Sequence, residues 1–353
     1  AAGTAGAVLL VLFFANSLSR TNTSLEPFRW LSPFWYYDRS DALVPGGSLD
    51  PLGIIVSPIA TLALSALAAV AFMRRDLGES LLCPRWRARA AVRVPSRNPL
   101  LRVPVLPSLY EQRAGLLFWL IGVSLLASMF SSLARSMVDL MENTPTMRAY
   151  LALLARGGTN LSQSFIGLAL FGVLQLLLAI YAVTHVARWA ADDAEGRLEL
   201  TLAQPVHRWW VVVERGLVLL VGATAIATMG ALVAGLSADS MTIQLDTAAL
   251  SIAALLLIPL TLAFGAVGAA LIGLAPRAAV PFLATVALVS YFVQQFGRLF
   301  RWPEWIMGLS LFELYGTPLT AGVYWTGLWL LLGITAAGFA VGIVSMRWRE
   351  IGT

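Results

Sequence analysis

A charged run between two long apolar segments is the part of the sequence best suited to chemistry or to a specific contact. Its carboxylates come first, at Asp192, Asp193 and Glu195. Leu198 and Leu202 follow four residues apart, which places them on one helical face. Carboxylates are favoured at a helix N-terminus, and Pro205 must stop a helix just before it. The spacing predicts a short amphipathic helix over 191–205, outside the membrane. The alternative is a solvated loop helix without a partner.

The rest of the chain consists mainly of apolar segments long enough to cross a bilayer. Of its 353 residues 58% are hydrophobic and only 12% are charged, about half the charged fraction of soluble domains. The sequence therefore predicts an all-α polytopic membrane protein with about eight transmembrane helices. The expected spans are 5–15, 52–73, 115–136, 165–186, 211–234, 248–274, 279–296 and 324–345.

Several chemistries are excluded by residue types that are rare or missing. All 24 basic residues are Arg, and a phosphate-binding P-loop requires Lys, so this chain cannot hydrolyse ATP by that route. The single cysteine, Cys83, excludes an internal disulfide, and the two histidines, His185 and His207, are too few for a His-based metal site. The basic residues cluster beside the spans, so the net charge of +5 indicates loop orientation and not nucleic-acid binding.

An Arg- and Pro-rich segment divides the chain. Residues 1–78 hold two spans with an outer segment between them, 79–114 form the linker, and 115–353 hold six spans. Because Arg accumulates in cytoplasmic loops, the linker is expected inside the cell, and the C-terminus as well. Binding of the linker to anionic lipid is the alternative reading of its charge.

An internal repeat relates the two ends of the chain. Leu31–Tyr37 (LSPFWYY) aligns with Leu309–Tyr315 (LSLFELY), and each stretch precedes one span. Those spans end in the similar runs Met73–Gly78 and Met346–Gly352. Parallel repeats in transporters form two pseudo-symmetric halves. We therefore expect residues 115–353 to be a complete six-span half, and the first half to lack about four upstream spans.

The charged run also carries a family resemblance. Asp193–Leu200 (DAEGRLEL) with Ala203–Arg208 (AQPVHR) resembles a signature of ABC-type export permeases, closest to the polyketide-antibiotic (tetronasin-type) and multidrug exporters. The resemblance implies a coupling helix that docks on a separate ATPase, carried here by Asp192, Asp193, Glu195, Gly196, Arg197, Glu199 and Pro205. It further implies an amphipathic connecting helix over 106–113 and outer helical segments at 309–320 and 31–44.

The function implied by this resemblance is that of the permease subunit of an ATP-driven exporter of hydrophobic drugs or antibiotics in a bacterial inner membrane. ATP and Mg²⁺ would bind two copies of a partner P-loop ATPase, so the chain itself would be neither an enzyme nor a cofactor protein. One alternative is a structural or assembly subunit, which needs no acidic amphipathic helix. Another is a proton-driven transporter, which needs acidic groups within its spans.

Polar residues in the spans give candidates for a pathway. A possible substrate cavity contains Gln175, Tyr291, Gln294 and Gln295, although hydrogen bonding between helices is the commoner role of buried Gln. A possible outer gate contains Arg135, Asp139 and Glu313. The first two are four residues apart and can pair on one helix, or simply anchor it at the interface. His185 is either part of a proton relay or an ordinary interfacial residue.

Overall fold

The computed structural model describes residues 9, 11–13, 16–17, 19, 29–39, 50–73, 105–142, 163, 165–196, 198, 207–241, 243, 245–297 and 299–348, with 71–73 and 137–142 described by their backbone alone. Every regular element among them is a helix. Seven of these helices are long and apolar enough to cross a membrane. The expected all-α polytopic membrane fold is confirmed, while most of the predicted span 5–15 lies outside the described residues.

The chain forms two compact units, residues 1–101 and 102–353. In the first unit the short helix α2 (Pro33–Tyr37) packs against the apolar helix α3 (Pro51–Met73). The Asp50 carboxylate accepts hydrogen bonds from the Leu52 N–H at the start of α3 and from the Arg39 guanidinium. These two donors, with Arg39 first, lower the pKa of Asp50.

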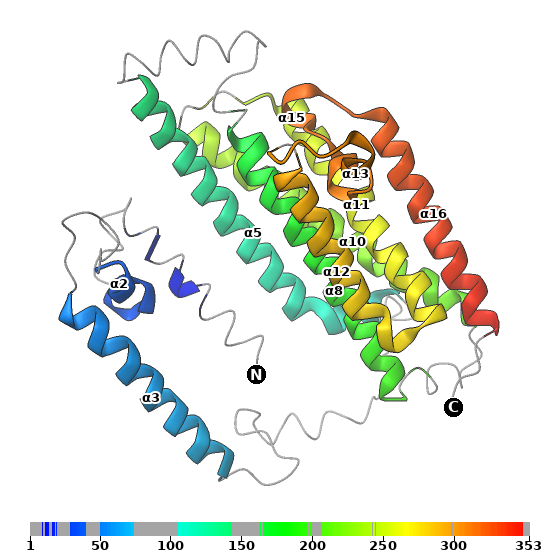
Figure 1. Cartoon of the computed structure of the whole chain (residues 1–353), viewed down its shortest axis with the longest axis horizontal. Coiled ribbons are helices and arrows are strands. Elements are labelled where there is room, and N and C mark those ends of the chain that lie inside the picture. The colour runs from blue at the N-terminus through cyan, green and yellow to red at the C-terminus, as the bar shows by residue number, and fades with distance from the viewer. Residues whose placement is uncertain are drawn as a thin grey trace. The chain divides into compact units, whose positions relative to one another are not determined.

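The described residues of the second unit form a bundle of six long helices with three short helices at one end (Figure 1). Helix α11 is its centre and packs against α8, α10, α12 and α16, while α5 packs against α10. The long helices are α5 (Val105–Glu142), α8 (Phe171–Ala194, preceded by the π-helical turn η5, Ile166–Leu170), α10 (Arg208–Ser240), α11 (Thr247–Leu274), α12 (Pro276–Phe296) and α16 (Trp325–Trp348).

Apolar and small residues explain why α11 can occupy the centre. Leu257, Leu260 and Phe264 are fully buried. Helix α16 approaches the backbone of α11 so closely that a Cβ built at Gly338 of α16 would lie 2.7 Å from the Ala266 carbonyl of α11. Small residues at helix contacts allow this approach, which van der Waals packing stabilises in a membrane where the hydrophobic effect cannot.

The short helices α13 (Glu304–Met307), α14 (Leu311–Tyr315) and α15 (Pro318–Ala321) lie between α12 and α16. Ser310 caps α14, since its Oγ accepts from the Glu313 N–H and also donates to the Ser290 carbonyl at 2.7 Å. The Tyr315 hydroxyl donates to the Ala253 carbonyl at 2.9 Å. Burial raises the pKa of this Tyr well above its usual value, so the phenol stays protonated as a donor.

The two stretches that align in the sequence have similar local structures. Helices α2 and α14 occupy the same five aligned positions, each after an extended serine, and pack on α3 and α16 respectively. Phe34 of α2 meets the ring of Phe13 edge-on, with centroids 5.3 Å apart. At the aligned positions Phe312 of α14 meets Tyr291 edge-on at 5.7 Å. These equivalent ring contacts at equal chain spacing agree with the predicted repeat, which stays a prediction.

Helix α5 differs from the sequence expectation at its beginning. A separate connecting helix over 106–113 was predicted to precede a span starting near 115, but α5 runs without interruption from Val105 to Glu142. The segment Tyr110–Ala114 contains no proline or glycine, and Gly115 lies within the helix, so nothing stops the helix there.

Candidate functional site

The carboxylates Asp192, Asp193 and Glu195 lie at the end of a spanning helix and not at the beginning of a new one. Asp192 and Asp193 belong to the last turn of α8, Glu195 is its C-cap, and Gly196 takes the left-handed conformation with φ of 71°. The sequence reasoning expected a helix N-terminus here, and that expectation was wrong. The run from Ala187 to Ala194 contains no helix breaker, so α8 continues until a glycine can adopt a positive φ.

Only part of the predicted coupling segment lies within the described residues. Glu195 is exposed, while Leu198 is helical and only 3% exposed as part of the apolar core. The burial of Leu198 agrees with the apolar face predicted from the leucine spacing. Arg197, Glu199 and Pro205 lie outside the described residues, so their predicted roles stay predictions.

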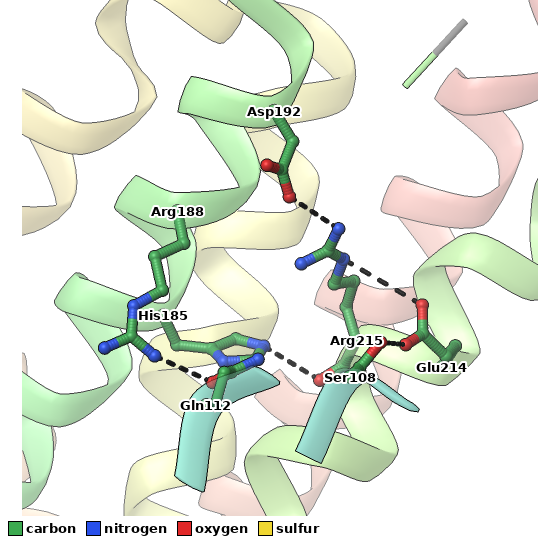
Figure 2. Close-up of polar contacts among 7 residues, drawn as sticks. All are labelled: Ser108, Gln112, His185, Arg188, Asp192, Glu214 and Arg215. Atoms are coloured by element: carbon green, nitrogen blue, oxygen red, sulfur yellow. Dashed lines mark hydrogen bonds and ion pairs between the residues drawn. The ribbon is translucent and has the colours of Figure 1, made fainter. Parts of the chain in front are cut away.

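Side chains tie the end of α8 to the beginnings of α5 and α10 (Figure 2). We call this group the three-helix network; it consists of Ser108, Gln112, His185, Arg188, Asp192, Glu214 and Arg215. The Arg215 guanidinium donates from Nη2 to Asp192 Oδ2 at 2.7 Å, and its Nε lies 3.9 Å from Glu214 Oε2. Glu214 in turn accepts a hydrogen bond from the Ser108 hydroxyl on α5.

Two further contacts join α8 to α10 and α8 to α5. His185 Nε2 lies 3.0 Å from the Arg215 carbonyl, so Nε2 carries the proton and donates. Arg188 donates to Gln112 Oε1 at 2.9 Å. Its guanidinium lies against α5, where a Cβ built at Gly115 would be 2.8 Å from Nη2. Each pair of the three helices is therefore joined by at least one polar contact.

The charges of the network are balanced and partly shielded. The side chains of Asp192, Glu214 and Arg215 are 23%, 13% and 18% exposed. Partial burial strengthens an ion pair relative to a fully solvated one, provided that each charge keeps a partner. Asp192 also lies at the negative end of the α8 dipole, where a carboxylate is disfavoured, and Arg215 offsets that cost.

Sequence reasoning missed most of this network. Ser108, Gln112, Arg188, Glu214 and Arg215 were not singled out from the sequence. A signal was present, because Glu214 and Arg215 are the only adjacent charged pair within a run that is otherwise apolar from Val211 to Ala234. Charges at such positions require partners, and the partners lie on other helices.

The predicted cavity glutamines bond to each other. Gln175 on α8 is 3% exposed, and its Oε1 accepts from Gln294 Nε2 on α12 at 3.0 Å. Gln294 also donates to the Phe312 carbonyl at 3.3 Å. These contacts match the alternative reading of interhelical hydrogen bonding. Tyr291 packs on Phe312, so three of the four candidates gather around Phe312, while Gln295 is exposed on α12. The role of these residues in a substrate cavity stays a prediction.

The three candidates for an outer gate have different surroundings in the fold. Arg135 is exposed and donates from Nη1 to the Met241 carbonyl at 3.3 Å, which joins the end of α5 to the end of α10. Asp139 is described by its backbone alone. Glu313 is half-buried in the first turn of α14. The proposed pairing of Arg135 with Asp139 stays a prediction.

A family model covers the bundle that holds this network. It describes the C-terminal domain of the multidrug efflux system permease Rv1217c and matches residues 101–347, more than two thirds of the chain. The chain belongs to this family. A search of curated proteins finds no significant match. The matched region begins and ends close to the limits of the second compact unit.

Family membership supports the sequence interpretation at the general level. The protein is a multi-pass membrane permease of the ABC-type efflux class. The tetronasin-type relationship stays a prediction.

Proposed function

We propose that this chain is the membrane subunit of an ABC exporter that moves hydrophobic drugs or antibiotics out of a bacterial cell, powered by a separate ATPase. In this proposal the chain has no catalytic residues, and two copies of the partner bind and hydrolyse ATP. The protein lies in the plasma membrane with the Arg-rich linker and the C-terminus in the cytoplasm, as the distribution of Arg favours.

The observation that carries the proposal is the form of the α8 end. The helix presents Asp193 and exposed Glu195, stops at Gly196, and is followed by buried Leu198. An acidic surface backed by an apolar anchor is suited to docking against a basic groove, because the anchor holds the segment to the bundle while the carboxylates stay accessible. The family match places this arrangement in an efflux permease.

An apolar groove supports the choice of substrate class. A hollow of about 290 Å³ lies between α10, α11 and α16, lined by Val212, Val213, Gly216, Leu217, Leu220, Leu262, Phe339 and Ile343. None of these residues carries a polar side chain, so the surface favours uncharged, lipophilic solutes over polar ones. In the proposed mechanism ATP-driven closure of the partner moves the segment after α8, and the bundle then changes the side from which its pathway is open.

The test reverses the charge of two carboxylates in the predicted coupling segment, 191–205. Glu195 is exposed, and changing Glu195→Arg together with Glu199→Arg should leave the thermal midpoint of the permease close to that of the wild type, because a docking segment that does not support the membrane fold tolerates a change of charge. Against a docking groove the same change is expected to cost several kcal/mol, and co-purification with the ATPase and ethidium-stimulated ATP hydrolysis should disappear together.

The matched control is Glu304→Arg, an exposed acidic residue at the other end of the bundle from the α8 end. It changes the same type of charge and should leave ATPase binding intact. If the double reversal binds and stimulates the ATPase like the control, the segment is an ordinary solvated loop and the exporter proposal loses its main support. An assembly subunit would give that same result.

A further inference from the structure

The three-helix network contains one residue, Arg215 of α10, that contacts α8 and also faces the α10 carboxylate bonded to α5. Arg215 contacts α8 twice: its guanidinium holds Asp192, and its carbonyl accepts from His185 two helical turns earlier. On the other side, Arg215 Nε faces the Glu214 carboxylate, which accepts from Ser108 of α5. A displacement of Asp192 is therefore passed to α10 directly and to α5 through two side chains, those of Arg215 and Glu214.

The position of Asp192 indicates that it serves this contact and not its own helix. In the last turn of α8 a carboxylate meets the negative end of the helix dipole, whereas a cation would be favoured there. Arg188, one turn earlier, has the favourable sign and pairs with uncharged Gln112. The unfavourably placed carboxylate is the one that receives the arginine of another helix.

Asp192 is also adjacent to the segment proposed to bind the ATPase. It lies three residues before Glu195, where α8 ends, and within the same last turn as Asp193. Because an α-helical turn is rigid on this scale, a force on the exposed carboxylates reaches Asp192 without an intervening hinge. The first glycine with positive φ comes after it, at Gly196.

We propose that the Asp192–Arg215 ion pair is the connection through which movement of the ATPase-binding segment reaches α10 and α5, with Arg215 as a positioning residue. This inference rests on the proposed function. It adds that coupling depends on a specific bond within the bundle, behind the docking surface. Loss of the bond should therefore leave docking intact and reduce the amount of substrate transported per ATP hydrolysed.

The experiment is a charge swap in the full-length permease reconstituted with its partner ATPase, with ethidium as the transported probe. Asp192→Arg and Arg215→Asp each place like charges together, and each is expected to lower ethidium transported per ATP by about tenfold, in the range of pairwise couplings within one network. The double variant restores an opposite-charge pair and should recover to within about threefold of the wild type.

Arg39→Gln is the matched control, because it also breaks an arginine–carboxylate pair, with Asp50, but in the first unit. Its transport-to-hydrolysis ratio should equal that of the wild type. Co-purification of the ATPase should be unchanged in all variants. The thermal midpoint is measured alongside, because a merely structural bond would lower stability and leave the ratio per folded complex constant.

The outcomes separate the two proposals. If the wild-type chain neither binds nor stimulates the ATPase, the proposed function fails and this inference fails with it. If the wild type transports ethidium but both single variants keep its ratio, the exporter function stands and the ion pair is not the connection. A double variant as uncoupled as the singles also overturns the inference, because the effect would then come from the residues separately and not from their bond.

Discussion

The close contact between α8 and α10 in the middle of the bundle gives a quantitative prediction. A Cβ built at Gly222 would lie 1.8 Å from the Tyr181 hydroxyl oxygen and 2.7 Å from its Cζ. Tyr181 is 4% exposed and packs edge-on against Trp119, with centroids 5.8 Å apart, so its ring cannot simply move away. Gly222→Ala must therefore separate the two helices or force Tyr181 out of its rotamer.

Overpacking of this kind costs about 1–3 kcal/mol, and the higher helix propensity of alanine returns about 1 kcal/mol. We expect a net loss of up to about 2 kcal/mol, which lowers the thermal midpoint by about 2–4 °C for each kcal/mol. The assay is thermal unfolding of the purified permease in detergent. Adding Tyr181→Phe removes the nearest atom and should recover part of the loss.

Gly122→Ala on α5 is the control, since no atom lies within 4 Å of its built Cβ. It should be neutral or slightly stabilising. A Gly222→Ala variant as stable as this control would show that α8 and α10 do not approach here, and the rigid three-helix arrangement would be refuted.

Two other predictions concern orientation and the buried glutamine pair. An impermeant thiol reagent added outside intact cells should not label Cys83, the single cysteine, because the Arg-rich linker is expected in the cytoplasm; efficient labelling would reverse the orientation of every loop. Gln175→Leu removes the acceptor of Gln294 and should lower stability by about 0.6–2 kcal/mol, measured by thermal unfolding. Gln295→Leu, at an exposed position, should have no such effect, and equal midpoints for the two variants would contradict the interhelical bond.

The sequence predicted the helices well because membrane spans are local features. A run such as Thr247–Leu274 needs only its own apolar residues to be recognised, and its N-cap Asp246 accepts from the Ala248 and Ala249 N–H groups at 2.9 and 3.2 Å. The aligned serines and rings of the repeat could be found for the same reason.

The candidate site was less predictable because it depends on contacts distant in the chain. Ser108 and Glu214 are separated by 106 residues, and no spacing rule joins them. The end of α8 was misplaced for a local reason: three carboxylates within four residues indicate a helix start, yet the arginine that offsets the cost of Asp192 at a helix end comes from α10. Tertiary context decided between two readings of the same residues.

The length of α5 has a mechanical consequence. Its 38 residues extend about 57 Å at 1.5 Å per residue, nearly twice the hydrocarbon thickness of a bilayer, which is about 30 Å. One tip carries Ser108 and Gln112, and near the other Arg135 holds the Met241 carbonyl. A pivot of about 10° at mid-membrane would move the tips by about 5 Å in opposite directions. Such a rod acts as a lever: a push at one face of the membrane appears at the other as an opposite swing.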